Sequence, residues 1–243
     1  MKEQIFGLHA VTTALQRRPA SVSEILVMEG RRDKRLAAVL ALAQRHGILV
    51  RECSRKALDE MVDGRHQGVV AQAEAPAQAH EKDLPGLVAE AGGRALLLVL
   101  DGVTDPHNLG ACLRSADAAG VTAVIAPKDN SASLNATVRK VACGAAEAVP
   151  FVQVTNLARC LRQLQEAGVW TVGLAGEATQ SLYDCDLRGP VALIMGAEGA
   201  GMRRLTREQC DYLAHLPMAG EVSSLNVSVA TGVCLFEAVR QRL

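Results

Sequence analysis

Aromatic residues are scarce in this chain of 243 residues, with one Trp, two Tyr and three Phe making up 2% of it. The 49% of residues that are hydrophobic must therefore form an aliphatic core, and modules that recognise RNA by stacking bases on sheet-surface aromatics are disfavoured. An excess of either charge is also absent, because Lys and Arg together number 26 and so do Asp and Glu. Net charge alone therefore does not require a polyanionic partner, although a local basic patch would still allow one.

Cysteine pairs with the spacing of a metal site are absent too. The seven cysteines are odd in number and none are arranged as CxxC, so neither a disulfide scaffold nor a zinc module is expected, and we expect no metal. No apolar run approaches the roughly 18 residues of a transmembrane helix, and no apolar signal core follows the N-terminus. We therefore expect a soluble, cytoplasmic protein without a membrane partner.

Charge and periodicity divide the chain into two domains. Residues 1–75 carry 12 Lys and Arg against 9 Asp and Glu, and they alternate helical with strand-like periodicity, as expected for a small α/β domain. Residues 76–93 combine Pro, Ala and Gly with little periodicity, followed by a short helix-like stretch that ends at Gly92 and Gly93, and they are predicted to be a linker. Residues 94–243 then form the second, larger domain.

The larger domain alternates strands with helices. Residues 95–100 are a continuous apolar run, which is typical of a strand buried on both faces of a parallel sheet. Further strands are predicted at 122–126, 149–154, 170–174, 191–195 and 212–216, with helical stretches between most of them. This pattern predicts an open parallel α/β sheet with helices on both faces, in which ligands bind beyond the carboxyl ends of the strands.

The loop after the first of these strands lacks the G-x-G-x-x-G of a dinucleotide-binding fold, which counts against a nicotinamide-dependent dehydrogenase. It offers polar groups at a helix start, with Asn108 as a predicted N-cap and Arg114 six residues further on. Two interpretations stay open. The residues are either a cap and a surface Arg, or a clamp for a phosphate or ribose, because Arg is a rigid bidentate donor.

A second loop, residues 196–201, holds three Gly, which lets backbone amides approach a ligand closely. Glu198 within it would repel a phosphate and better suits a cationic or hydroxyl-rich ligand. Arg203, Arg204 and Arg207 follow, either as a solvated helix face or as a contact to an RNA backbone.

The third loop, residues 217–230, runs into a final helix predicted at 224–242. Ser223 or Ser224 is its predicted N-cap, and Asn226 would lie in the first turn near unpaired backbone donors. The helical spacing predicts a buried side formed by Leu225, Val229, Val233 and Phe236. No G-x-S-x-G elbow is present, so a serine hydrolase is not indicated.

Together, the three loops resemble the motifs of the SpoU (TrmH-like) family of RNA ribose 2′-O-methyltransferases, within the SPOUT class. The first motif is residues 105–110 (DPHNLG) with Arg114, the second is 194–201 (IMGAEGAG), and the third combines 216–218 (LPM) with 224–230 (SLNVSVA). Residues 6–11 (FGLHAV) and 66–69 (HQGV) are similar to the family's ribosomal-protein-like substrate-binding domain.

This resemblance implies a fold, a cofactor and partners. The second domain would be a parallel α/β sheet tied into a trefoil knot that holds S-adenosyl-L-methionine, preceded by a small ribosomal-protein-like α/β domain that binds RNA. The protein would be a homodimer. The bacterial members that it resembles methylate a guanosine ribose in the peptidyl-transferase P loop of 23S rRNA, so 23S rRNA is the expected substrate. A tRNA 2′-O-methyltransferase of the same family and a non-catalytic, RNA-binding ribosome assembly factor are the alternatives.

The resemblance also implies which residues form the site. The catalytic residues would be Arg114, Asn108, Glu198, Ser224 and Asn226, with Arg114 acting as base or activating the 2′-hydroxyl through the neighbouring phosphate. A free Arg is a very poor base near pH 7, so it would need help from the others. The methyl donor would be held by Leu174, Gly176, Gly196, Leu216, Pro217 and Leu225.

Overall fold

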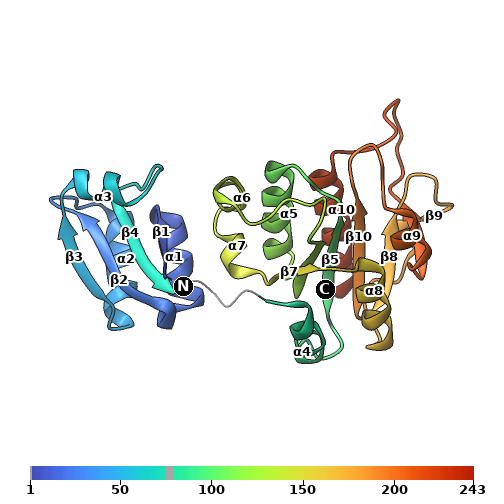
Figure 1. Cartoon of the computed structure of the whole chain (residues 1–243), viewed down its shortest axis with the longest axis horizontal. Coiled ribbons are helices and arrows are strands. Elements are labelled where there is room, and N and C mark those ends of the chain that lie inside the picture. Colours follow the sequence, from blue (N-terminus) through green and yellow to red (C-terminus); the bar gives the residue numbers. More distant parts are fainter. Residues whose placement is uncertain (1, 75–78) are drawn as a thin grey trace. The chain divides into compact units, whose positions relative to one another are not determined.

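The computed structural model describes residues 2–74 and 79–243 of the chain. The chain divides into two compact units, Met1–Ala77 and Gln78–Leu243, and each unit has its own sheet and hydrophobic core (Figure 1). Both units alternate strands with helices, as the α/β periodicity of the sequence predicts.

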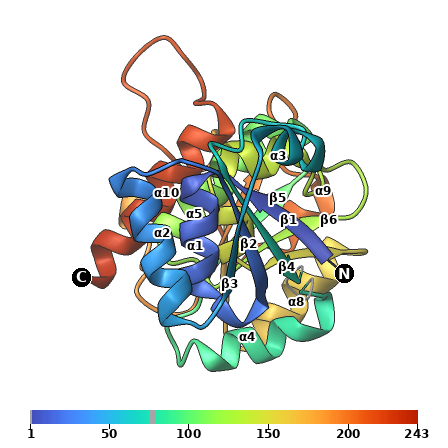
Figure 2. The same ribbon diagram turned by 90° about the vertical axis from the view of Figure 1, so that its left-hand side faces the viewer.

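The first unit is a four-stranded sheet between two layers of helix. Its strands are β1 (Lys2–Phe6), β2 (Val22–Met28), β3 (Leu49–Cys53) and β4 (Val69–Glu74), in the order β1-β4-β2-β3. Helices α1 (Leu8–Arg17) and α2 (Lys34–Arg45), separated by the short turn η1 (Pro19–Ser21) and β2, lie side by side, as Figure 2 shows. They cover one face of the sheet, and α3 (Arg55–Met61) packs Leu58 against Leu26 and Val70 on the other face.

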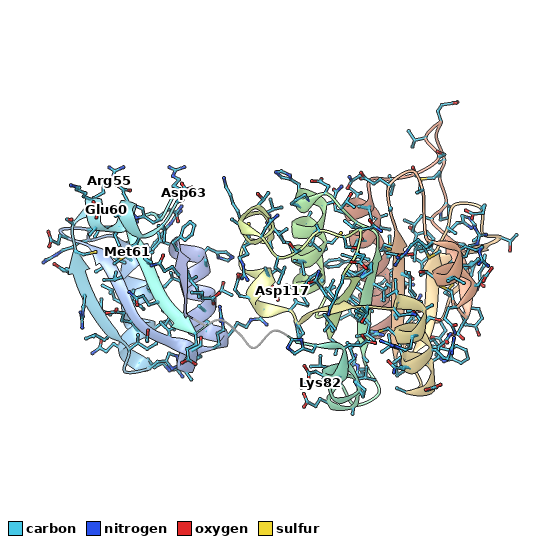
Figure 3. All side chains as sticks on the ribbon, viewed as in Figure 1. Arg55, Glu60, Met61, Asp63, Lys82 and Asp117 are labelled. Atoms are coloured by element: carbon cyan, nitrogen blue, oxygen red, sulfur yellow. The ribbon has the colours of Figure 1, made fainter. Side chains whose placement is uncertain are left out.

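The basic residues at the start of α3 are matched by acidic residues on the same helix. Arg55 and Lys56, at the start of α3, lie 3.7 Å and 3.9 Å from Asp59 and Glu60 one turn later. Figure 3 shows Arg55, Glu60 and Asp63 at the surface of the same part of the unit. Acidic and basic groups are therefore interleaved there, and a polyanion would meet both signs of charge.

The structure differs from the predicted linker over 76–93. Residues 75–78 lie outside the described residues, but η2 (Glu81–Asp83) and α4 (Leu84–Glu90) follow within this range. Leu84 and Val88 are 3% and 8% exposed and pack into a core of the second unit. This helix corresponds to the helix-like stretch predicted before Gly92 and Gly93, and Pro85 is compatible with it because proline is tolerated in the first turn of a helix.

The second unit is a parallel sheet of seven strands in the order β7-β6-β5-β10-β8-β11-β9. The strands are β5 (Leu96–Asp101), β6 (Ala123–Pro127), β7 (Phe151–Val154), β8 (Trp170–Leu174), β9 (Gln180–Ser181), β10 (Val191–Gly196) and β11 (Tyr212–His215). All six predicted strands are present. The two-residue β9, followed by the turn η3 (Leu182–Asp184), was too short for periodicity to find.

Helices cover both faces of this sheet. On one face lie α5 (Pro106–Ala118), α6 (Ala136–Ala142), α7 (Ala145–Ala148) and α10 (Val227–Arg242). On the other lie α4 and α8 (Leu157–Glu166), while α9 (Arg204–Glu208) links β10 to β11. This burial on both faces explains the unbroken apolar run of β5. In the part of the chain that the structure describes, no helix is both long and apolar enough to cross a membrane.

Strand β10 lies in the middle of the sheet, between two strands that precede it in the chain. It pairs in parallel with β5 on one side and with β8 on the other. The chain therefore returns into the sheet instead of adding a strand to its edge. This order is compatible with the trefoil knot that the resemblance implies, and the knot stays a prediction.

Helix α10 begins later than predicted and buries a different side. It begins at Val227, and its buried side is formed by Val227, Thr231, Cys234, Leu235, Glu237 and Ala238. Val229 and Phe236, predicted to be buried, are 52% and 51% exposed. The prediction was wrong because this helix carries apolar residues on two sides, and their spacing does not say which side packs on the sheet.

Candidate active site

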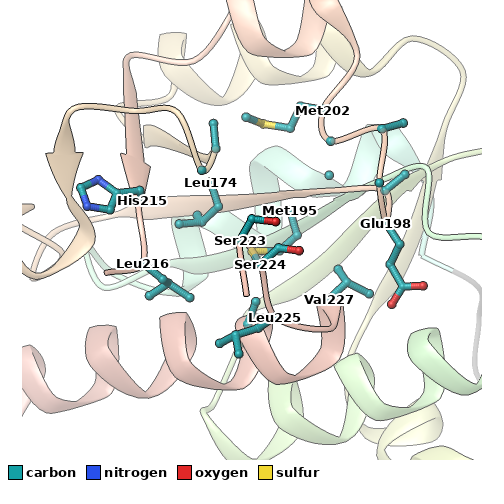
Figure 4. A pocket seen from close by; sticks show the side chains of 18 of the residues that line it. Leu174, Met195, Glu198, Met202, His215, Leu216, Ser223, Ser224, Leu225 and Val227 are labelled. Carbon is teal, nitrogen blue, oxygen red and sulfur yellow. The ribbon is translucent and has the colours of Figure 1, made fainter. Parts of the chain in front are cut away.

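A cavity of about 610 Å³ lies at the carboxyl ends of β8, β10 and β11 (Figure 4). Parallel α/β sheets bind their ligands at this edge, and small-molecule sites have volumes of roughly 300–1,000 Å³. Leu174 at the end of β8, Met195 in β10 and Leu216 after β11 give the cavity an apolar lining. Most of the remaining lining residues belong to the loops after these strands.

One wall is the loop after β10, residues 196–202, here named the glycine loop. It turns back on itself, since the Ala197 N–H donates to the Gly201 carbonyl at 3.0 Å and the Gly201 N–H donates to the Ala197 carbonyl at 2.9 Å. Gly196 has no room for a side chain, because a Cβ would lie 2.2 Å from the carbonyl carbon of Gly201. Gly199 and Gly201 have φ of 74° and 68°, in the left-handed region that glycine adopts readily and other residues rarely adopt. The shape of this wall therefore depends on its glycines.

The three arginines after the glycine loop are each paired with a carboxylate. The pairs are Arg203 with Asp101, Arg204 with Glu208, and Arg207 with Glu177. Partners within the protein weaken the interpretation of this group as an RNA-backbone contact. A hydrogen bond from its own backbone N–H, together with Arg207, lowers the pKa of Glu177 and keeps it ionised at the cavity wall.

Three loops meet in one hydrogen-bonded group at the edge of the cavity, formed by Asn108, Glu198 and Asn226 and here named the amide–carboxylate cluster. Glu198 Oε1 accepts from Asn226 Nδ2 at 2.6 Å and from Asn108 Nδ2 at 3.1 Å. Asn226 Nδ2 also donates to Asn108 Oδ1 at 3.1 Å. The cluster therefore joins the loops that follow β5, β10 and β11.

Helix capping explains why the side-chain amides of Asn108 and Asn226 are free to bind Glu198. Asp105 caps α5, with its side chain accepting from the His107 N–H at 3.1 Å, and this hydrogen bond is the main cause of the lowered pKa of Asp105. The prediction that Asn108 is the cap was wrong, and its amide is left to meet Glu198. Asn226, not Ser223 or Ser224, caps α10 through its Oδ1 while its Nδ2 reaches the cluster.

The other two predicted catalytic residues lie apart from the cluster. Ser224 lines the cavity (Figure 4). Arg114 does not line it, and it lies on α5 about 9 Å along the helix axis from Asn108. It is exposed and makes no hydrogen bond or ion pair with any described residue. Its guanidinium therefore keeps five N–H donors for a ligand.

Most of the predicted donor-binding residues line the cavity: Leu174, Gly176, Gly196, Leu216 and Leu225. Pro217 is exposed and is not part of the lining. His215, which was not predicted as a site residue, also lines the cavity, and its Nδ1 is buried with no hydrogen-bond partner among the described residues. Its position at the carboxyl end of a predicted strand was the available signal. The described residues include no group of three or more His, Cys, Asp or Glu that could hold a metal ion.

The model of the SpoU rRNA Methylase family matches residues 95–236, a range that contains all three loops of the site. The chain belongs to the SpoU rRNA methylase family. A second model, for RNA 2′-O ribose methyltransferase substrate binding, matches residues 4–79. The two family matches thus correspond to the two sheets of this SpoU-family protein.

Three similar proteins differ in how much of this chain they match. The 23S rRNA (guanosine-2′-O-)-methyltransferase RlmB of Escherichia coli K12 is 59% identical over 243 residues, which is 100% of both chains. The AdoMet-bound rRNA methyltransferase from Sinorhizobium meliloti matches with a TM-score of 0.77 and 28% identity, covering 100% of this chain and 88% of that chain. The A. aeolicus TrmH/SpoU tRNA modifying enzyme matches with a TM-score of 0.56 and 29% identity, covering 67% of this chain and 84% of that chain.

Proposed function

We propose that this SpoU-family protein transfers a methyl group from S-adenosyl-L-methionine to the ribose 2′-oxygen of a guanosine in 23S rRNA. The observation that carries the proposal is the amide–carboxylate cluster, which brings polar residues of three loops to the edge of one cavity. The E. coli relative, 59% identical along its whole length, is named for this reaction. The AdoMet complex of the S. meliloti relative supports the choice of methyl donor.

The cavity fits this donor chemically. Leu216 supplies an apolar surface for an adenine ring, and the backbone of Gly196 can pair with the ring's edge. The unpartnered Nδ1 of His215 is a polar atom that a ligand can satisfy. The carboxylate of Glu198, which is bound by two neutral amides, favours a cation over an anion at the wall, whereas Glu177 is paired with Arg207. When bound, S-adenosyl-L-methionine supplies an electrophilic methyl group on a sulfonium sulfur.

The protein must then orient the 2′-hydroxyl and stabilise the negative charge that develops on its oxygen as the hydroxyl proton passes to water. Arg114 is exposed and unpaired, and a guanidinium binds phosphate with two parallel hydrogen bonds. We assign it to the phosphate beside the target ribose, because an Arg that stays protonated cannot act as a base. The cluster fixes Glu198 through Oε1, and the Ser224 hydroxyl lies at the cavity wall, where it can orient the ribose.

We favour ribosomal RNA over tRNA as the substrate because the rRNA-modifying relative matches more of the chain than the tRNA-modifying relative does. The rRNA methyltransferase from S. meliloti covers the whole chain, whereas the A. aeolicus tRNA-modifying enzyme covers 67% of it. The first unit is matched by the substrate-binding model, and we propose that this unit selects the rRNA. The position of the target guanosine in the P loop stays a prediction.

The exposed apolar side of α10 supports a homodimer. Phe236 and Val229 are about half exposed on this helix, although its opposite side is already packed into the core. A second copy that covers this side would remove the apolar surface from water.

All seven cysteines are unpaired, which supports a reducing compartment, the cytoplasm.

The deciding experiment is transfer of labelled methyl from S-adenosyl-L-methionine to two transcripts, 23S rRNA and bulk tRNA, followed by mapping of the modified ribose. Label on the 2′-oxygen of one 23S guanosine is the expected result. Label on tRNA alone would refute the substrate and keep the reaction. Absence of donor binding would refute the proposed function as a whole.

A further inference from the structure

A buried carboxylate beside the site takes no part in the cluster. Asp101, the last residue of β5, is 1% exposed. Its Oδ2 accepts from the backbone N–H of Arg203 at 2.8 Å, and its Oδ1 accepts from Arg203 Nε at 2.6 Å. Both oxygens are therefore used by one residue. An unpaired buried charge is strongly unfavourable, so this contact specifies the position of Arg203 closely.

The two ends of the glycine loop both meet Asp101. At the loop's start, Gly196 lies directly beside Asp101 in the parallel pairing of β10 with β5. Just past the loop's end, Arg203 is bound by the Asp101 side chain through backbone and guanidinium. One residue of β5 therefore sets where the loop leaves the sheet and where it returns.

The segment between these ends forms the cavity wall and carries Glu198 into the cluster. Its own internal bonds are few, namely the reciprocal pair between Ala197 and Gly201 and one bond from the Ala200 N–H to the Glu198 carbonyl. Three of its seven residues are glycines, which have many accessible conformations when a loop is released. The shape of the loop therefore depends on its anchors.

We propose that Asp101 is a positioning residue for methyl transfer: by binding Arg203, it holds the glycine loop in the shape that receives the methyl donor and presents Glu198. Neither Asp101 nor Arg203 lines the cavity, so the effect passes through the loop backbone. This inference rests on the proposed function, because it takes the cavity to be the donor site.

Two substitutions test the anchor, and each has a matched control. Asp101→Asn keeps the size of the side chain but replaces one acceptor oxygen with an N–H₂ group, which faces an N–H donor of Arg203. Its control is Asp211→Asn. Asp211 lies just before β11, at the opposite end of the strands from the cavity, and its carboxylate accepts hydrogen bonds from the N–H and hydroxyl of Thr171 and from Gln165. Arg203→Ala is compared with Arg204→Ala, which loses a pair within α9 only.

The measurements are hydrogen exchange of the peptide 196–203, equilibrium binding of S-adenosyl-L-methionine, thermal unfolding, and KM and kcat. We expect Asp101→Asn to speed exchange of the Ala197, Gly201 and Arg203 amides and to weaken donor binding about tenfold, as for the loss of one hydrogen bond to a charged group. We expect Arg203→Ala to weaken donor binding at least as much, because it leaves the buried Asp101 carboxylate without its cation, and the double variant to lose less than the sum of the two single variants. KM for the donor should rise in both, and Arg204→Ala should bind the donor as the wild type does.

Unchanged exchange and donor affinity in Asp101→Asn would overturn the inference. So would an equal loss of donor affinity in Asp211→Asn at equal loss of thermal stability, because the effect would then be general destabilisation. If the wild type binds no donor, the proposed function fails. The exchange of the 196–203 peptide still decides in that case whether Asp101 anchors the loop.

Discussion

Gly196→Ala should abolish the shape of the donor cavity while leaving the sheet folded. A Cβ at this position would lie 2.2 Å from the carbonyl carbon of Gly201 and 2.3 Å from the backbone nitrogen of Met202. Non-bonded carbon atoms settle about 3.5–4.0 Å apart, so the returning part of the loop would have to move by roughly 1.3 Å. The atoms in the way belong to the backbone, and no change of rotamer relieves the contact.

A misplacement of about 1 Å in an active site lowers catalytic efficiency on the order of 100-fold. We therefore expect kcat/KM for methyl transfer to fall about 100-fold in Gly196→Ala, and the dissociation constant for S-adenosyl-L-methionine, measured by calorimetry, to rise. Overpacking of this kind lowers the free energy of unfolding by about 1–3 kcal/mol, which a urea titration measures. Methyl transfer at a fixed donor concentration should fall with the affinity.

Two other alanine variants separate the clash from a general effect of losing a glycine. Gly199→Ala has open space but a φ of 74°, so it should show only backbone strain of about 1 kcal/mol and a milder loss of affinity. Gly189→Ala lies outside the cavity with no atom near its Cβ and should bind the donor as the wild type does. If Gly196→Ala binds the donor as tightly as Gly189→Ala, the packing argument for the loop is refuted.

Four further outcomes are expected. Glu198→Gln, which removes the charge that two amides bind, should lower the single-turnover rate about 10- to 100-fold with donor affinity less affected, and an unchanged rate would exclude a role for the cluster. Arg114→Ala should lower kcat about 10²- to 10³-fold, as for the loss of one donor that stabilises developing charge, while stability stays within about 0.5 kcal/mol because the side chain is exposed, and wild-type turnover would refute its assignment. Phe236→Asp should convert a dimer into monomers in light scattering, whereas a dimer that survives the change would place the interface elsewhere. Hydrogen bonds from Arg240 lower the pKa of Glu237 from 4.5 to about 2, so the stability that this pair contributes is present above about pH 4.5 and lost as the pH falls toward 2. Urea unfolding at pH 5, 3 and 2 should show less pH dependence in Glu237→Gln, and equal slopes for both proteins would contradict the lowered pKa.

The sequence predicted the strand ends where the site lies, but not the contacts that build the site. The strand predicted at 95–100 is β5, one residue later, because burial on both faces leaves a continuous apolar run that local reasoning detects. Asn108 was misassigned because Asn and Asp are both good caps, and Asp105 stands three residues earlier. The meeting of Asn108 with Glu198, 90 positions later, depends on how strands are ordered in the sheet, which no local pattern records.

The same limit explains two further differences between the sequence prediction and the structure. Helix α10 presents apolar residues on two sides, so periodicity found a helix and could not choose between its faces. Asp101 reads in the sequence as a polar residue that ends a strand. Its partner Arg203 is 102 positions away, and only the parallel pairing of β5 with β10 brings them together.

The placement of β10 between β5 and β8 determines when the sheet can be completed during folding. Val191 pairs with Leu96, 95 positions earlier, and such distant pairings form late and slowly. A nascent chain that stops short of β10 leaves two apolar strands with open edges, which are templates for aggregation. The donor cavity is lined wholly by residues between 174 and 230, so it is assembled only after residue 230 has been made. Capture of nascent chains on an immobilised donor analogue would therefore report that synthesis has passed residue 230, and no shorter chain would hold the methyl donor.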